Sequence, residues 1–253
     1  MQAGLTDAPR IRRISAEQAG SWLAAGWRDM TCHPRLSLGF GAVFAAIGAL
    51  LALALVAFDL GSLLLPVASS FTLVGPLGAI CLYEISRRIE RGEPVSLAAV
   101  WDGVRARGGQ IANMGLVLTL ALVAWLMAGM VIFALFRSGS PPPLDRFVVD
   151  VLLDPQSLPF LLAGTLCGGA IAAATFSISV FAMPMLLDRD VSPATAMAAS
   201  VRAVRLNWPA MIGWAATIAV VVGFGIVTLF AGLVVCFPLL AHASWHAYRD
   251  VIG

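Results

Sequence analysis

The sequence predicts an all-helical polytopic membrane bundle, and two features carry that prediction. Hydrophobic residues make up 60% of the chain and charged residues only 12%, which is about half the charged share of a soluble domain. Several apolar runs also reach the roughly 20 residues that a helix needs to cross a bilayer. The strands of a membrane β-barrel would alternate apolar and polar residues, and these runs do not.

Six transmembrane helices are expected, arranged as three repeats of a surface helix followed by a transmembrane hairpin. The third repeat shows this plan most clearly, because Ser192 is a good N-cap and Pro193 suits the first helical position. Pro209 then separates the amphipathic helix from a long apolar run. The repeats cover about residues 15–86, 95–187 and 192–250 of a single domain, 14–253, which follows a basic tail, 1–13.

The first repeat is expected to begin at Ser15, which is spaced from Gln18 as in a capping box. The dipeptide His33-Pro34 ends this surface helix, and a first crossing covers about residues 36–58. A second crossing covers about residues 63–85. Its prolines, glycines and small polar residues favour the interior of the bundle, where neighbouring helices satisfy freed backbone groups.

The second repeat opens at Ser96 and continues with crossings at about residues 111–136 and 160–187. A further surface helix is predicted in the polar connection between them. In the third repeat, residues 209–248 carry no charge, and as a single helix they would be about 60 Å long, twice the thickness of the hydrocarbon core. The chain must therefore fold back, most plausibly between Gly223 and Gly232.

The arginines predict the orientation of the bundle. All 16 basic residues are arginines, and only Arg137 and Arg146 fall on the far side of the predicted bundle. This asymmetry predicts a bacterial inner-membrane protein whose two termini both lie on the cytoplasmic side. The surface helices would then contact anionic headgroups, through Trp22, Trp27, Arg28, Trp101, Arg105, Arg107, Arg202, Arg205 and Trp208.

Three segments carry a resemblance to a known family: WLAAGWRD at 22–29, LYEISRRIERGE at 82–93 and HASWHAYRDV at 242–251. Together they resemble an uncharacterised bacterial family of integral membrane proteins, domain of unknown function 2189, over almost the whole chain. The resemblance implies a membrane location and a helical fold, and it implies no activity.

Within the fourth crossing, Gly164-x-x-x-Gly168 predicts close packing between helices.

A metal or haem site is one interpretation of the histidines. His242 and His246 are four residues apart and share a helix face, an arrangement that can bind a metal or haem iron. Glu84 and His33 are expected at a similar depth and would complete the site. The alternatives are an interfacial polar belt or a proton relay for the histidines, and an ion pair with Arg87 or Arg88 for Glu84.

The favoured function is that of a non-enzymatic scaffold or an accessory subunit of another membrane protein complex, with no cofactor and no nucleic acid. No hydrolase, metalloprotease or nucleotide-binding motif is present in the sequence. One alternative is a small-molecule transporter or channel, and another is a metal- or haem-handling factor for a respiratory oxidase. A polar cavity would favour transport and a packed apolar centre would favour the scaffold, and the residues that decide between them are Ser69, Ser70, Thr72, Thr175, Ser177 and Ser179.

Overall fold

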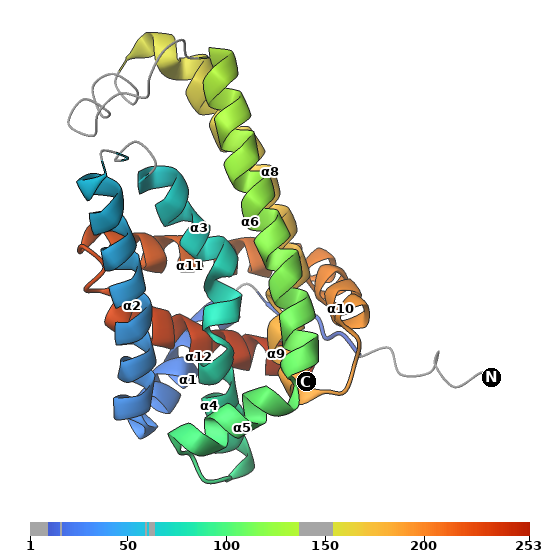
Figure 1. Cartoon of the computed structure of the whole chain (residues 1–253). Helices are drawn as coiled ribbons and strands as arrows, with labels where there is room; N and C mark the ends of the chain where they lie inside the picture. Colours follow the sequence, from blue (N-terminus) through green and yellow to red (C-terminus); the bar gives the residue numbers. More distant parts are fainter. Residues whose placement is uncertain (1–9, 16, 59, 61–63, 137–153) are drawn as a thin grey trace.

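The computed structural model describes residues 10–15, 17–58, 60, 64–136 and 154–253, and all its regular elements in these ranges are helices (Figure 1). The predicted all-helical fold is therefore confirmed. The predicted surface helix between the third and fourth crossings, together with Arg137 and Arg146, lies outside the described residues. The helices are α1 (Gln18–Cys32), α2 (Pro34–Ala57), α3 (Leu64–Gly78), α4 (Ile80–Arg91), α5 (Leu97–Ala106), α6 (Gly108–Phe136), η3 (Pro155–Ser157), α8 (Leu158–Ser179), α9 (Ala182–Asp188), α10 (Pro193–Leu206), α11 (Trp208–Val227) and α12 (Leu233–Val251).

A short helix is followed, after a single residue, by a long apolar helix at three places. His33 joins α1 to α2, Arg107 joins α5 to α6, and Asn207 joins α10 to α11. The hydroxyl groups of Ser96 and Ser192 accept hydrogen bonds from backbone N–H groups and cap α5 and α10.

The cap predicted for α1 is wrong. This helix begins at Gln18, and Glu17 occupies its N-cap position without forming a side-chain hydrogen bond to the helix. The side-chain carbonyl of Gln18 is buried and has no partner among the described residues, so it cannot close a capping box with Ser15. The other two short helices therefore have capped starts that α1 lacks.

Four of the described helical segments are long and apolar enough to cross a membrane: α2, α6, α11 and the segment Pro155–Asp188, which contains α8 and α9. The six crossings and three repeats of the sequence prediction are not confirmed. The described part of α3 has 15 residues, and the second half of α12 is polar, with His242, His246, Arg249 and Asp250, so neither helix is among the four. Figure 1 also shows α11 and α12 running across α2 and α3 rather than alongside them.

Large apolar side chains are exposed on the outside of these helices. Leu50 of α2, Met130 of α6, Leu166 of α8 and Val220 of α11 are 65–72% exposed. Soluble monomers do not expose contiguous apolar faces of this extent. The protein is therefore an integral membrane protein, as its composition predicts.

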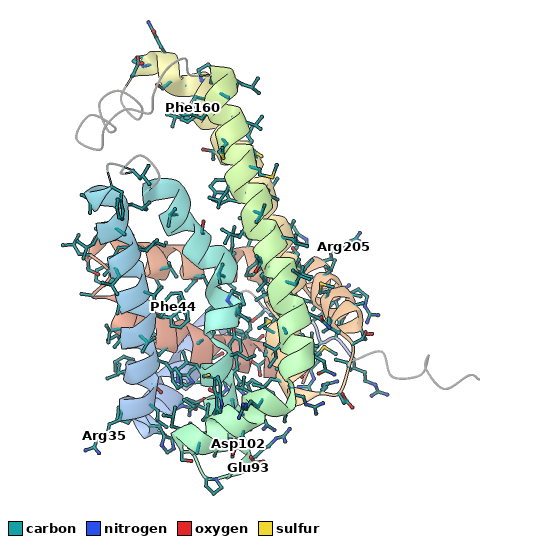
Figure 2. All side chains as sticks on the ribbon, in the orientation of Figure 1. Arg35, Phe44, Glu93, Asp102, Phe160 and Arg205 are labelled. Carbon is teal, nitrogen blue, oxygen red and sulfur yellow. The ribbon has the colours of Figure 1, made fainter. Side chains whose placement is uncertain are left out.

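Most of the charged side chains labelled in Figure 2 lie at one end of the long helices, whereas Arg205 of α10 lies beside the middle of α6. In Figure 2, Arg35, Glu93 and Asp102 project from the end formed by α4, α5 and the start of α2, whereas Phe160 lies at the opposite end of α8. Several of the largest fully buried side chains lie at the same end as the charges, namely Trp22, Trp214, Trp245 and Tyr248. Helix α12 lies at the centre of this end and contacts α1, α2, α4 and α11.

The helices that return toward the charged end are interrupted. Helix α3 ends at Gly78 and α4 begins at Ile80, α8 ends at Ser179 and α9 begins at Ala182, and Pro238 lies inside α12. The backbone groups freed between α8 and α9 are satisfied by Ser200 of α10, which accepts a hydrogen bond from the Phe181 N–H and donates one to the Ser177 carbonyl. Interruptions of this kind are stable at membrane depth where they are buried in protein or line a cavity.

The predicted contact between small residues in α8 involves only one of the two glycines. A Cβ atom at Gly168 would lie 2.5 Å from the ring of Trp125 on α6, whereas a Cβ atom at Gly164 would have no neighbour within 4 Å. Gly168 therefore packs α8 against α6 within the chain, and Gly164 has no close neighbour among the described residues.

Candidate functional site

A buried polar cluster joins four helices at the charged end of the molecule. It consists of Asp29 from α1, Ser37 from α2, Ser86 from α4, and His242 and His246 from α12. The Nε2 atom of His242 lies 3.0 Å from the Ser37 hydroxyl, and its Nδ1 atom lies 2.8 Å from the Ser86 hydroxyl. The Oδ2 atom of Asp29 accepts a hydrogen bond from Ser86 at 2.6 Å and lies 2.9 Å from Nε2 of His246.

The hydrogens of this cluster can be placed by counting donors and acceptors. Ser86 has one hydroxyl hydrogen and donates it to the Asp29 carboxylate, so its oxygen must accept from Nδ1–H of His242. The other nitrogen of His242 then accepts from the Ser37 hydroxyl. Both ring nitrogens of His242 therefore have hydrogen-bond partners within the chain.

The Asp29 carboxyl group is held in its ionised form. Burial by itself would raise the pKa of Asp29, but the hydrogen bonds from His246 and Ser86 outweigh burial and hold this pKa below its usual value. Since α1 lies outside the candidate membrane spans, this carboxylate belongs to the charged end and holds α1 against α4 and α12.

The variant Asp29→Asn is expected to lower the free energy of unfolding at neutral pH by about 2 kcal/mol, because it removes an ionised acceptor of two hydrogen bonds. A depressed pKa stabilises the folded state above the unfolded pKa and loses that effect as the pH falls. The difference between the native chain and the variant should therefore shrink below about pH 4. Thermal unfolding in mild detergent across this pH range measures the difference in stability. The control is Asp102→Asn, at an exposed position of α5, which should unfold like the native chain at every pH.

A second set of polar contacts fixes the end of α12. The indole N–H of Trp245 donates to Glu90 at 3.0 Å, and Arg249 donates to the same carboxylate at 2.9 Å. The hydroxyl of Tyr248 donates to Asp188 at 2.9 Å. Each of these aromatic side chains is almost completely buried. The polar half of α12 is thus enclosed by other helices rather than lying free at a membrane surface.

The predicted metal ligands are divided between two places. Glu84 is fully buried, pairs with Arg87 and Arg88 at 2.7 Å each, and lies against Gly103 of α5. His242 and His246 face α1, α2 and α4, and His33 lies at the junction of α1 and α2. Among the residues that the structure describes, no three His, Cys, Asp or Glu side chains are grouped as metal ligands.

Most of the residues predicted to contact headgroups are exposed, with one clear correction. Trp27, Trp101 and Trp208 are 51–61% exposed. Trp22 is only 1% exposed, because it packs edge-to-face on Trp214 and donates a hydrogen bond to Asp250 at 2.7 Å. Its predicted place at a membrane surface is therefore wrong. The arginines of this set are exposed or partly exposed, namely Arg28, Arg105, Arg107, Arg202 and Arg205.

The arginines of this set differ in their partners. Arg107 is paired with Asp190 at 2.9 Å, whereas Arg105 lies over the ring of Trp101, 6.0 Å from its centroid. Arg202 and Arg205 form no ion pair within the described ranges. The surface of α10 therefore presents free guanidinium groups.

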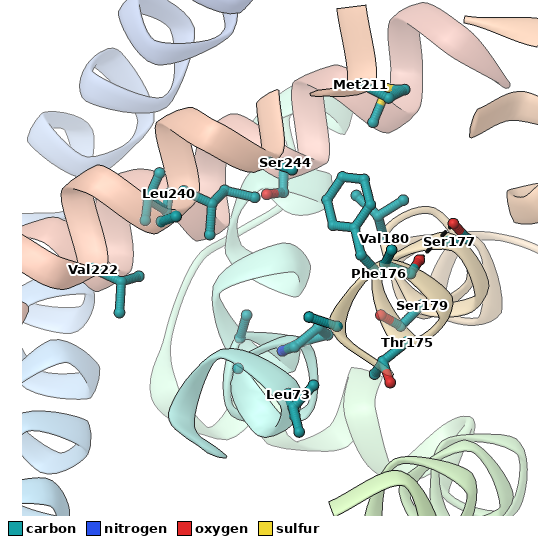
Figure 3. Close-up of a pocket in the computed structure, with 18 of the residues that line it drawn as sticks. Leu73, Thr175, Phe176, Ser177, Ser179, Val180, Met211, Val222, Leu240 and Ser244 are labelled. Atoms are coloured by element: carbon teal, nitrogen blue, oxygen red, sulfur yellow. Dashed lines mark hydrogen bonds between the residues drawn. The ribbon is translucent and has the colours of Figure 1, made fainter. Parts of the chain in front are cut away.

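A cavity of about 600 Å³ lies between α3, α8, α11 and α12 (Figure 3). Its walls are apolar, and none of the lining residues that the structure describes is charged. Some lining residues, such as Ile212 and Trp208, are more than 60% exposed, so the cavity reaches the outer surface of the protein. The walls include Leu73, Phe176, Met211, Val222, Phe237 and Leu240.

The polar atoms of the cavity lie at α8 and at the junction of α4 with α12. Tyr83 is hydrogen-bonded to Ser244, and the Ser177 hydroxyl donates to the Ala173 carbonyl at 2.7 Å. Thr175 and Ser179, which are 4% and 2% exposed, have no hydrogen-bond partner among the described residues. The centre of the bundle is therefore neither the polar channel nor the packed apolar interior that the sequence left open, and the side chains of Ser69 and Thr72 lie outside the described set.

The segment that supplies Ser86, Thr175 and Ser179 matches a known family. Residues 64–188, from α3 to α9, match the family described as "Predicted integral membrane protein (DUF2189)". This match covers just under half of the chain. The predicted resemblance is thereby confirmed over these residues, and the description of DUF2189 states no activity. No curated protein and no solved structure matches the chain.

The DUF2189 segment contributes Ser86 to the polar cluster and α8 to the wall of the cavity, but Asp29, Ser37 and His242 lie outside the matched residues. Reasoning from the sequence missed Asp29, Ser37 and Ser86 as parts of a site. A signal was available, because Asp29, Ser86 and His242 each belong to one of the three segments that carry the family resemblance. Treating those segments as spatial neighbours would have found four members of the cluster, since the third segment also contains His246.

Proposed function

We propose that this protein is a non-enzymatic membrane protein that holds an uncharged, lipid-like small molecule in the cavity between α3, α8, α11 and α12. The observation that carries the proposal is a cavity of about 600 Å³ with no charged lining residue in the described chain, which is within the usual size of ligand sites. This proposal develops the small-molecule alternative. The sequence favours a scaffold, which a packed apolar centre would support, whereas the described centre contains a cavity.

The same proposal includes the membrane arrangement. Helix α3 and the apolar first half of α12 would return the chain after α2 and α11, as α8 does after α6, giving six membrane segments in three repeats. The repeated order of short helix, single linking residue and long helix supports this plan. The excess of arginine at one end supports cytoplasmic termini in a bacterial inner membrane, and the free arginines of α10 support contact with anionic headgroups.

A ligand in the cavity should accompany the protein through purification in mild detergent. Solvent extraction followed by mass spectrometry is expected to find a stoichiometric amount of an apolar molecule. The variant Ala215→Phe places an aromatic ring at a half-buried lining position and should reduce the amount bound by about tenfold, since it fills space that the ligand needs.

The matched control is Val220→Phe, on the outward face of the same helix at 71% exposure. It adds a similar ring outside the cavity and should leave the bound amount unchanged. Equal occupancy in both variants and in the native chain would show that the extracted molecule is bulk lipid, and would refute the proposal.

A further inference from the structure

We infer that the molecule held in the cavity carries a carbonyl oxygen, which accepts hydrogen bonds from the hydroxyl groups of Ser179 and Thr175. This inference rests on the proposed function and adds the chemical class of the ligand. Ser179 and Thr175 are four residues apart on α8, so their side chains lie on one face of the helix. Both residues line the cavity, and in Figure 3 the hydroxyl group of Ser179 points into it.

These two hydroxyl groups differ from others in the apolar helices. The usual partner of a buried Ser or Thr hydroxyl in such a helix is the carbonyl oxygen four residues earlier. Thr119, Ser177 and Thr217 each form this bond, at 2.7–2.9 Å. Ser179 and Thr175 form no such bond, and no other described residue bonds to either side chain. Both residues are 96–98% buried, but their hydroxyl oxygens are not among the fully enclosed unpaired atoms, so these oxygens are accessible from the cavity.

The helix break does not account for the free hydroxyl of Ser179. Ser179 is the last residue of α8, but Ser200 of α10 satisfies the Phe181 N–H and the Ser177 carbonyl at this break. The Ser179 hydroxyl therefore remains available to a molecule in the cavity. Two donors on one wall suit an oxygen atom with two lone pairs, which is the hydrogen-bonding pattern of a carbonyl group.

The lining also excludes a charged headgroup inside the cavity. No described lining residue is charged, and transferring an unpaired carboxylate into apolar surroundings costs much more than transferring a neutral carbonyl group that is hydrogen-bonded. On the opposite wall, the hydroxyl groups of Tyr83 and Ser244 are hydrogen-bonded to each other. The ligand class is thus a long apolar molecule with an uncharged ketone, quinone or ester group.

Three probes of equal chain length separate these features: methyl pentadecyl ketone, heptadecane and heptadecanoate. Binding is measured on the full chain in nanodiscs, with radiolabelled ketone and the other two as unlabelled competitors. The native chain is expected to bind the ketone about tenfold more tightly than the alkane, and the anion most weakly. The double variant of Thr175→Val and Ser179→Ala should weaken ketone binding by about tenfold and leave alkane binding unchanged.

The matched control is Ser177→Ala, which removes a hydroxyl that lines the same cavity but already bonds to the Ala173 carbonyl. This variant should bind the ketone like the native chain. If ketone and alkane bind equally, if the anion binds most tightly, or if the double variant has no effect, the carbonyl assignment is wrong while the apolar cavity stands. If none of the three probes binds, the proposed function itself fails.

Discussion

Replacing Gly41 by valine is expected to destabilise the protein by about 3 kcal/mol or more, at the upper end of overpacking effects. Gly41 lies where α2 crosses α12, and a Cβ atom there would overlap the carbonyl oxygen of Val234 and come within 2.7 Å of the ring of Pro238. Backbone atoms cannot move aside as a flexible side chain can, so the two helices must separate. Separation would also pull Ser37, one turn earlier in α2, away from His242.

The measurement is thermal unfolding of the purified protein in mild detergent, together with its elution profile as a folded, monodisperse species. Gly39→Val is the control on the same helix, because a Cβ atom at Gly39 has no neighbour within 4 Å. Gly39→Val should unfold like the native chain or at a slightly higher temperature. Equal stability of the two variants would mean that α2 and α12 do not approach closely at Gly41.

Glu84→Gln is the second substitution with a large expected effect, and it should lower the free energy of unfolding by about 3 kcal/mol. The Glu84 side chain is fully buried and pairs with Arg87 and Arg88, whose side chains are only 14% exposed. Removing the carboxylate leaves two poorly hydrated guanidinium groups beside each other. A neutral amide cannot compensate both charges, although its shape is almost the same.

Glu93→Gln provides the comparison, because Glu93 is 38% exposed and lies 3.6 Å from Arg88. Exposed pairs of this kind contribute little, so the change in unfolding free energy should stay within about 0.5 kcal/mol. If Glu84→Gln is as stable as Glu93→Gln, the carboxylate has no structural role.

Local patterns in the sequence predicted local structure well. The caps at Ser96 and Ser192 and the interruption after His33 all follow from short-range preferences, and the structure contains each of them. The bias of charge toward one end also follows from composition, because arginine avoids hydrocarbon. These features need no knowledge of which helices touch.

The failures concern contacts between distant segments. Trp22 has the spacing of an interfacial residue, but its surroundings depend on Trp214 and Asp250. The histidine spacing is compatible with metal binding, but it could not reveal that Ser37 and Ser86 contact His242. The cavity could not be predicted either, because empty space between helices leaves no periodic pattern in any one of them.

The position of α12 has a consequence for biosynthesis. Its contacts with α1 join residues far apart in the chain, and the bond from Trp22 to Asp250 spans 228 positions. A ribosome synthesises α1 long before α12. The face of α1 that packs against α12 therefore stays exposed while the intervening helices enter the bilayer. Contacts of such high sequence separation also form slowly. Nascent chains stalled before α12 should therefore be recognised by membrane quality-control proteases, and chains released after it should resist them.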